Sequence, residues 1–316
     1  MKHNFKITAI LLLMFLVTQF IGLYVINQYS LQTITKINPQ TGLQENITIN
    51  PLPSIFQTQE AKTQQDFFSF FIQLLISFVI AVTLVLILIR YKFKFLMRGW
   101  FFAVVSLALG IAFYAVLKNY LSSAWLVSLA FAIPLGFLKV YKPSFLIHNL
   151  TELLIYPGIA AIFVPILSPL TIIILLVFIS IYDMWAVWHS KIMIKMAKFH
   201  MNELKIFGGF LIPNLTKNVR EKIKNLKMSK SKTKSKRKGV NVSFAILGGG
   251  DVVFPLIAAG VFLRAFGLIP ALLVIAGAFL GLLFLLLISE KKKFYPAMPF
   301  ITAGVFLGML ASLLFI

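Results

Sequence analysis

Long apolar runs follow one another along almost the whole of this 316-residue chain, separated by short segments rich in basic or turn-forming residues. A helix needs about 20 mainly apolar residues to cross the hydrocarbon core of a bilayer. Nine stretches approach this length: 6–26, 67–89, 100–117, 122–138, 149–167, 169–188, 242–262, 266–289 and 294–316. A helix satisfies all its backbone hydrogen bonds within one segment, as lipid requires. The sequence therefore predicts an all-α, polytopic membrane protein with nine transmembrane helices.

Composition excludes a soluble domain and several kinds of catalytic site. Hydrophobic residues make up 59% of the chain and charged residues only 12%, more apolar surface than a soluble domain of this length can bury. The chain has no cysteine, which excludes disulfides, thiolate metal sites and cysteine nucleophiles. Its four histidines form no HExxH pattern, which argues against a zinc protease. We expect neither a metal nor another cofactor.

The distribution of basic residues predicts the orientation of the chain. Basic loops resist translocation and stay cytoplasmic. Nine spans with a cytoplasmic N-terminus would leave 26 of the 30 lysines and arginines inside the cell. The four outside would be Lys36, Lys62, Lys118 and Arg264. The sequence therefore predicts a cytoplasmic N-terminus and an external C-terminus.

The spans and the basic residues divide the chain into three parts. Residues 1–190 are predicted to form a six-helix part, and residues 242–316 a three-helix part. Between them, residues 191–241 read as a basic cytoplasmic loop that is partly disordered, with an amphipathic interfacial helix over 192–212. The basic tract at 227–239 has no aromatic residue that could stack on bases, so it favours anionic lipid over nucleic acid as a partner.

Two of the three aspartates in the chain, Asp183 and Asp251, lie inside predicted spans. A carboxylate is unfavourable in a bilayer, so such a residue is a functional-site hypothesis. At 1.5 Å per residue, Asp183 would lie about 9 Å and Asp251 about 15 Å from the cytoplasmic ends of their helices. The sixth and seventh spans are antiparallel neighbours along the chain. We therefore expect the two carboxyl groups to face one another in the cytoplasmic half of the bilayer.

Such a pair has a well-defined chemistry. Two carboxyl groups close together in a low-dielectric site share one proton and titrate as a coupled pair. The ionised member can deprotonate a water that attacks a peptide carbonyl, while the protonated member donates to the carbonyl oxygen. The residues leave open which of the two aspartates starts protonated.

Three short motifs accompany the aspartates and supply candidate substrate-binding residues. Tyr182 directly precedes Asp183, and its hydroxyl could orient that carboxylate. Three glycines precede Asp251 and allow another chain to approach the backbone closely. Two prolines lie near the start of the last span. They could leave carbonyl groups without a hydrogen-bond partner beside the aspartates, or they could simply mark the N-terminus of a helix. The candidates are Tyr182, Gly248, Gly249, Gly250, Pro296, Ala297, Met298 and Pro299.

These motifs resemble those of the presenilin and signal peptide peptidase family of intramembrane aspartyl proteases. Tyr182 and Asp183 correspond to its YD motif, 248–251 to GxGD, and 296–299 to PAL, with Met298 in place of the family's leucine. The motifs occur in the expected order and on the expected spans. The resemblance implies an aspartic endopeptidase that cleaves within or near transmembrane helices of membrane proteins or signal peptides, with Asp183 and Asp251 as the catalytic dyad.

The resemblance also implies where the chain works and what it meets there. A cytoplasmic N-terminus is similar to presenilin rather than to signal peptide peptidase, and favours type I substrates. The compact chain resembles a microbial homologue, which would sit in the cell membrane and act alone or as a homo-oligomer. The apolar segment 207–213 resembles the self-cleaved loop of presenilin, although contact with the membrane surface explains it equally well.

Two other functions use similar residues. A transporter can relay protons or cations through buried carboxylates, but it usually shows internal repeats, and none is found here. A type IV prepilin-like peptidase shares the GxGD aspartate, but not the tyrosine-aspartate span or the proline pair. His148 and Glu152 lie four residues apart near the cytoplasmic boundary, where the spacing favours a local ion pair over a catalytic role.

Overall fold

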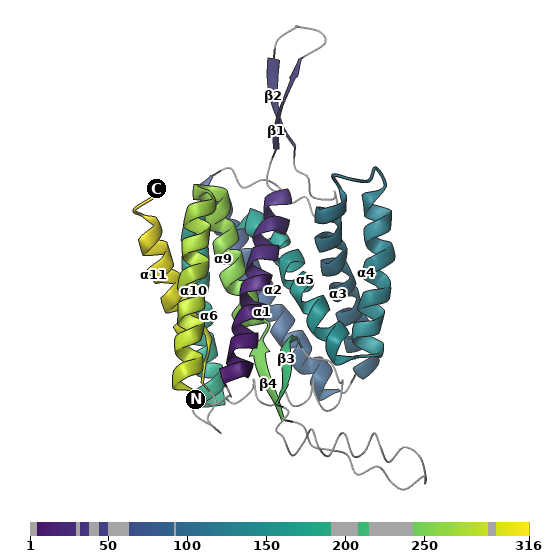
Figure 1. Cartoon of the computed structure of the whole chain (residues 1–316), viewed down its shortest axis with the longest axis vertical. Helices are drawn as coiled ribbons and strands as arrows, with labels where there is room; N and C mark the ends of the chain where they lie inside the picture. Colours follow the sequence, from purple (N-terminus) through teal and green to yellow (C-terminus); the bar gives the residue numbers. More distant parts are fainter. Residues whose placement is uncertain are drawn as a thin grey trace.

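The computed structural model describes residues 5–29, 32–37, 44–49, 63–91, 93–190, 208–214, 243–289 and 295–315 as a helical bundle with a β-hairpin at either end (Figure 1). The helices are α1 (Phe5–Gln28), α2 (Gln64–Arg90), α3 (Lys94–Leu117), α4 (Ala124–Tyr141), α5 (Phe145–Phe163), α6 (Pro169–Trp185), α9 (Gly250–Phe266), α10 (Leu268–Ile288) and α11 (Met298–Ser312). The strands are β1 (Gln32–Ile37), β2 (Gln44–Ile49), β3 (Gly209–Asn214) and β4 (Ser243–Gly248). Short helical turns, Val164–Ile166 and Ala186–Ser190, extend α5 and α6.

A described helix lies at each of the nine predicted spans, but two of them are short. Seven helices, α1 to α6 and α10, are long and apolar enough to cross a membrane. Helices α9 and α11 have 17 and 15 residues. The start of α1 and the end of α11 lie at opposite ends of the bundle (Figure 1). The integral, multi-pass character of the protein follows from these helices, whereas the number of crossings stays a prediction.

The predicted seventh span, 242–262, is wrong in its first part. Ser243–Gly248 forms strand β4, and helix α9 begins only at Gly250. Along the strand Ala245 and Leu247 are buried while Ile246 is exposed, the alternation of a half-buried strand. Three consecutive glycines disfavour helix at this point, because glycine loses more backbone freedom than any other residue when a helix forms. An apolar run followed by glycines is therefore divided between two kinds of structure.

Strand β3 lies inside the segment that was predicted as a loop with an interfacial helix. The helix prediction is wrong for residues 209–212, which belong to β3; residues 191–207 and the basic tract at 227–239 lie outside the described residues. Strand β3 pairs antiparallel with β4, from Gly209 opposite Gly248 to Asn214 opposite Ser243. The apolar segment 207–213 thus contributes most of a strand, whose Phe210 and Ile212 side chains are buried.

The other hairpin, β1 with β2, projects from the opposite end of the bundle (Figure 1). Its strands pair antiparallel from Gln32 opposite Ile49 to Ile37 opposite Gln44. They lie in the segment between the first two predicted spans. The β3–β4 hairpin lies at the same end of the bundle as the start of α1 and the α2–α3 and α4–α5 connections (Figure 1). Most of the basic residues are predicted on the side of the N-terminus, so we call this the basic end.

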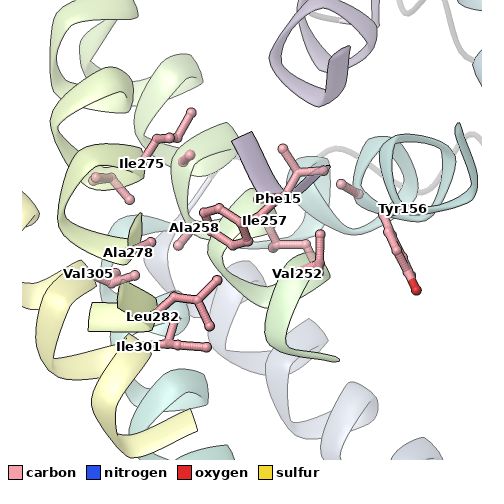
Figure 2. Packing of buried hydrophobic residues seen from close by; sticks show 14 of the residues in the cluster. Phe15, Tyr156, Val252, Ile257, Ala258, Ile275, Ala278, Leu282, Ile301 and Val305 are labelled. Atoms are coloured by element: carbon pink, nitrogen blue, oxygen red, sulfur yellow. The ribbon is translucent and has the colours of Figure 1, made fainter. Parts of the chain in front are cut away.

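The main core joins α1, α5, α6, α9, α10 and α11 (Figure 2). Phe15 of α1 and Val252 and Ile257 of α9 are buried there, near Leu282 and Ile301 of the last two helices. Helix α1 packs on both α5 and α9, and α9 packs in turn on α5, α6 and α10. Helix α2 is the least buried of the spanning helices. The two ends of the sequence therefore build a common core, and α9 lies within it.

Glycines bring α10 and α11 into direct backbone contact. A Cβ at Gly277 would collide with the carbonyl oxygen of Gly304, and one at Gly281 with that of Phe300. Small residues at a membrane helix interface allow this close approach, and van der Waals packing and weak hydrogen bonds then hold the helices together. The contact fixes α11, and therefore the Pro296–Pro299 segment at its start, against the rest of the core.

Candidate active site

Asp183 lies near the end of α6 that faces the basic end of the bundle, and its side chain is buried, with 5% of the residue exposed. Helix α6 starts at a capping box, in which Ser168 and Thr171 satisfy each other's backbone groups, with Pro169 in its first turn. One turn before Asp183, the Ser180 hydroxyl donates to Thr302 Oγ1 of α11 at 2.8 Å. This hydrogen bond sets α6 against α11 at the depth of the aspartate.

The start of α11 points at the Asp183 carboxylate. The backbone N–H of Met298 donates to Asp183 Oδ2 at 3.0 Å, and the backbone of Ala297 also interacts with this carboxyl group. Met298 is the first residue of α11, so the N–H has no partner within its own helix. The positive end of the helix dipole adds to the attraction for a negative charge. The proline motif therefore reaches Asp183 through its backbone, with Pro299 in the first turn of the helix.

Asp251 is the second residue of α9, and this helix packs on α6, which carries Asp183. The two carboxyl groups are close enough for their charges to interact. The backbone of Gly248 hydrogen-bonds to Asp251, whose Oδ2 lies only 3.0 Å from the place where a Cβ on Gly248 would sit. Both acids are thus held beside helix N-termini, Asp251 on its own helix and Asp183 on a neighbour.

The predicted depth of Asp251 assumes a continuous helix from residue 242, and this assumption is wrong. Asp251 is in the first turn of its helix, not in the third. The chain reaches this depth along strand β4, which rises about 3.3 Å per residue instead of 1.5 Å. The charges of the two aspartates still interact, because the extended strand replaces the missing turns of helix. That the two carboxyl groups face one another stays a prediction.

Three contacts fix the turn that carries Asp251. Gln19 of α1 is fully buried, and its Nε2 donates to the carbonyl oxygen of Val252 at 3.0 Å. The backbone N–H of Gly249 donates to the carbonyl oxygen of Gly208 at 3.3 Å, beside the first residue of β3. The ring of Tyr156, from α5, lies over Gly249. Contacts from α1, α5 and the β-hairpin therefore hold the start of α9 on three sides.

Tyr182 is only partly buried, and its described contacts are aromatic. Its ring meets that of Phe78 edge to face at 5.8 Å, and that of Trp185 at 6.3 Å. Phe78 belongs to α2, so Tyr182 joins α6 to the least buried helix. The prediction that the Tyr182 hydroxyl orients the neighbouring carboxylate is not supported by any contact of these described residues.

The predicted contact of His148 with Glu152 is present, with His148 Nε2 3.8 Å from Glu152 Oε1, and it is an ion pair only when the imidazole is protonated. A closer partner of Glu152 was missed, because Lys139 Nζ lies 2.6 Å from the same oxygen. In the sequence, Lys139 counts only as one of the 26 basic residues predicted on the cytoplasmic side. A lysine directly after the predicted span 122–138, between two apolar residues, is the available signal, together with the polar cluster at His148, Asn149 and Glu152. Nothing in the sequence indicates Gln19 or Tyr156.

The fold is that of a multi-pass membrane protein with an acidic residue on each of two neighbouring helices, α6 and α9. The chain belongs to the signal peptide peptidase and presenilin family: the family model described as "Signal-peptide peptidase, presenilin aspartyl protease" matches residues 47–316. A comparison with curated protein sequences finds no match.

Two solved structures share the fold. Both are of a presenilin family intramembrane aspartate protease, one in space group C222 and one in P2. The first has a TM-score of 0.59 at 18% sequence identity, with 97% of this chain and 98% of that chain covered. The second has a TM-score of 0.57 at 20% identity, with 96% of each chain covered. The likeness in fold therefore extends over almost the whole chain.

Proposed function

We propose that this protein is an intramembrane aspartic endopeptidase with Asp183 and Asp251 as its catalytic dyad. The neighbourhood of the two carboxyl groups, with the Met298 amide on one of them, is the observation that carries the proposal. Two negative charges in a dry site repel each other strongly, so the pair keeps one proton between them. Two backbone groups, those of Met298 and Ala297, stabilise the charged form of Asp183, and one, that of Gly248, stabilises the charged form of Asp251. We therefore assign the base to Asp183 and the acid to Asp251.

In this mechanism Asp183 removes a proton from a bound water, and the water oxygen attacks the carbonyl carbon of the scissile peptide. Asp251 gives its proton to the carbonyl oxygen, which produces a neutral tetrahedral diol. The C–N bond then breaks as the nitrogen takes up the proton that Asp183 holds, and a diol hydroxyl returns a proton to Asp251. Amine and carboxylic acid leave, and the dyad keeps its single proton throughout.

A transmembrane helix must unwind before its peptide bonds can be attacked, since its carbonyl groups are bonded within the helix. We propose that the unwound segment adds as a strand to the open edge of β4 and lies between the substrate-binding segments 248–250 and 296–299. In an antiparallel pair, every second residue points its N–H and C=O groups away from the partner strand. In β4, Ile246 points these groups away from β3, toward the open edge, and the residue is 42% exposed. Strand addition to such an edge is a common mode of peptide recognition.

The orientation of the chain determines which substrates fit. With a cytoplasmic N-terminus, as the basic residues predict, the dyad lies in the cytoplasmic half of the bilayer. Type I membrane proteins, whose N-termini lie outside, then present the cytoplasmic half of their helix to the site in one fixed direction. We therefore favour type I substrates, cleaved in the cell membrane of a microbe, with anionic lipids at the basic loop.

The decisive test is cleavage of a type I transmembrane peptide by the purified protein in liposomes. Asp183→Asn and Asp251→Asn keep the size and shape of the side chain but remove the acid. We expect either variant to lose all detectable cleavage while inserting and unfolding like the wild type. Full activity in both variants would refute the dyad. A wild-type protein that conducts protons or cations without cleaving any peptide would favour the transporter alternative.

The strand-addition proposal is tested by photocrosslinking from single cysteines, which the cysteine-free chain allows. A photoreactive group on Ile246→Cys or Ala297→Cys should capture a bound transmembrane peptide. Trp125→Cys on α4, which is exposed as Ile246 is, serves as the control. Capture from Trp125→Cys, with none from the other two, would place the substrate elsewhere on the protein.

A further inference from the structure

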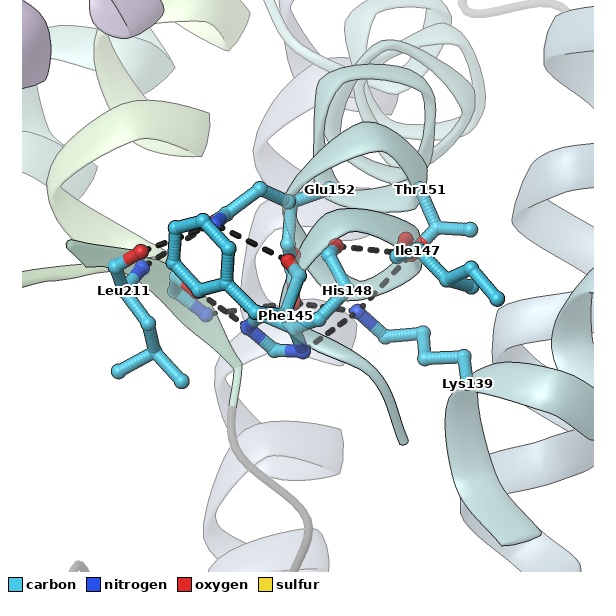
Figure 3. A network of polar contacts seen from close by, with 9 residues as sticks. Lys139, Phe145, Ile147, His148, Thr151, Glu152 and Leu211 are labelled. Atoms are coloured by element: carbon cyan, nitrogen blue, oxygen red, sulfur yellow. Dashed lines mark hydrogen bonds and ion pairs between the residues drawn. The ribbon is translucent and has the colours of Figure 1, made fainter. Parts of the chain in front are cut away.

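We propose that a buried polar cluster on α4 and α5 is a positioning site, which holds β3 and through it the turn that carries Asp251. The cluster consists of Lys139, His148, Asn149, Thr151 and Glu152, and we call it the α5 clamp (Figure 3). The inference deepens the proposed function, because it names residues that act on the dyad from a distance. None of them belongs to the motifs that identify the dyad.

The clamp binds backbone groups of β3 in the way that a neighbouring strand would. The Asn149 side chain donates from Nδ2 to the carbonyl oxygen of Leu211 at 2.9 Å, and its Oδ1 accepts from the Leu211 N–H at 3.0 Å. Two residues earlier, the Gly209 carbonyl oxygen lies 2.8 Å from His148 Nε2, and the Gly209 N–H donates to Glu152 Oε1 at 3.3 Å. Three side chains thus satisfy both groups of two alternate residues.

The internal contacts of the clamp determine which group donates. Lys139 Nζ lies 2.6 Å from Glu152 Oε1, 3.3 Å from Thr151 Oγ1 and 3.5 Å from His148 Nδ1. An ammonium group only donates, so His148 Nδ1 accepts and the imidazole proton lies on Nε2, where it donates to Gly209. Lys139 and Glu152 are 2% and 1% exposed, and a buried carboxylate needs such a partner. Lys139 therefore allows Glu152 to serve as an acceptor for the strand.

The clamp determines which edge of the hairpin is open. Gly209 and Leu211 point their backbone groups at α5, so the residues between and after them, Phe210 and Ile212, face β4. Side chains of α5 therefore close the outer edge of β3 along these residues. A third strand can add only to β4, on the side where the chain continues to Asp251.

Contacts at the end of the hairpin transmit this position to the dyad. Gly209, which the clamp holds, lies opposite Gly248 in the strand register. Next to it, the Gly249 N–H donates to the Gly208 carbonyl oxygen, and the Tyr156 ring, one turn along α5 from Glu152, covers Gly249. Gly248 then hydrogen-bonds to Asp251. Movement of β3 away from α5 would therefore shift the Asp251 carboxyl group relative to Asp183.

The test compares two double variants that both remove the buried charges. Lys139→Met with Glu152→Gln keeps an oxygen that accepts from Gly209, whereas Lys139→Met with Glu152→Met has none. We expect the first to retain kcat/KM within about threefold of the wild type and the second to lose about tenfold or more, the effect of one buried hydrogen bond and the strand that depends on it. Equal kcat/KM values in the two would show that the pair only stabilises the fold.

Hydrogen exchange of residues 209–212 in the liposome-reconstituted protein gives a second measurement that needs no proteolysis. Exchange should be faster in Lys139→Met with Glu152→Met and in Asn149→Leu than in the wild type. Thr18→Val is the matched control, because Thr18 is also buried and its hydroxyl, among the described residues, donates within α1, to the Met14 carbonyl oxygen. Unchanged exchange in both clamp variants would overturn the proposal. Failure of the dyad itself would instead appear as a wild type that protects β3 but does not cleave.

Discussion

At the scale of single residues, the three glycines before Asp251 are not equivalent. A Cβ on Gly249 would lie 2.9 Å from Tyr156 Oη, and one on Gly248 would lie 3.0 Å from Asp251 Oδ2. The nearest atom to a Cβ on Gly250 is in the Phe254 ring at 3.6 Å, an ordinary contact. Gly248 and Gly249 are therefore required by lack of space, and Gly249 has the more rigid neighbour because Tyr156 is packed in the core.

We expect Gly249→Ala to lower kcat/KM about tenfold or more, since one extra methyl group in a packed site costs about 1–3 kcal/mol and here displaces the turn beside Asp251. Gly250→Ala should stay within about threefold of the wild type by the same reasoning. Adding Tyr156→Phe to Gly249→Ala removes the nearest atom and should recover part of the activity. A greater loss for Gly250→Ala than for Gly249→Ala would contradict this assignment. Cleavage of a transmembrane peptide in liposomes measures all three.

Met298 acts on Asp183 through its backbone, so its side chain should be replaceable. Met298→Leu conserves volume and restores the residue that the family usually has, and its activity should be within about twofold of the wild type. Met298→Pro removes the N–H and fits the first turn of a helix. Loss of a hydrogen bond to a charged group is worth about 1.5–3 kcal/mol, so we expect kcat/KM to fall about 10- to 100-fold. Equal activity of the two variants would show that the amide is not needed.

Residue types alone identify both aspartates and the three motifs around them as candidates, because an acidic residue inside an apolar run is rare and indicates a functional site. The partners of these residues could not be predicted in the same way. Gln19, Lys139 and Tyr156 are 232, 112 and 95 residues away from Asp251 along the chain. Their side chains are common types, and only the packing of α1, α4 and α5 gives them a role beside the site.

At the scale of elements, the close pair α10 and α11 fixes one half of the candidate site. Their backbones touch at Gly277 and Gly304, and α11 carries the Met298 amide to Asp183. On the other half, a six-residue strand followed by a glycine turn carries Asp251. The site therefore lies where a regular helix pair meets an interruption of helical structure.

Gly304→Ala should destabilise the fold, because the new Cβ would collide with the carbonyl oxygen of Gly277, and backbone cannot move aside as a side chain can. We expect a loss of about 1–3 kcal/mol, measured as a lower thermal unfolding midpoint in detergent micelles. Gly99→Ala in α3 is the control, since nothing lies within 4 Å of its Cβ position, and higher helix propensity should leave the midpoint unchanged or raise it. The opposite order of the two midpoints would exclude the close contact.

Long apolar runs predict the helices correctly. The wrong predictions concern the two strands of one hairpin, β3 and β4. Strand β4 was absorbed into a predicted span because a short apolar run has no period that separates strand from buried helix. Strand β3 was read as part of an amphipathic helix or a loop. Each strand is stable only because the other is present, and more than 25 residues separate them in the sequence. Local pattern cannot reveal that dependence.

At the scale of the whole molecule, the two hairpins mark opposite ends of the bundle (Figure 1). Basic residues predict that the end with β3 and β4 faces the cytoplasm. A single cysteine at Thr33→Cys in β1 should then react with a membrane-impermeant maleimide added to intact cells. Lys142→Cys, in the α4–α5 connection, should react only after permeabilisation. The reverse pattern would invert the orientation and with it the preference for type I substrates.

The sequence by itself determined that this chain lies in the membrane, which acidic residues lie inside its apolar segments, and to which family it belongs. These properties depend on the chemical character of short segments, which a bilayer selects without reference to the rest of the chain. Only the tertiary structure decided that a β-hairpin brings Asp251 to its depth, that a helix N-terminus meets Asp183, and that a lysine and a glutamate are buried together. Each of these results from contacts between distant segments, because a buried polar group takes its partner from whatever backbone or side chain the packing places within hydrogen-bonding distance.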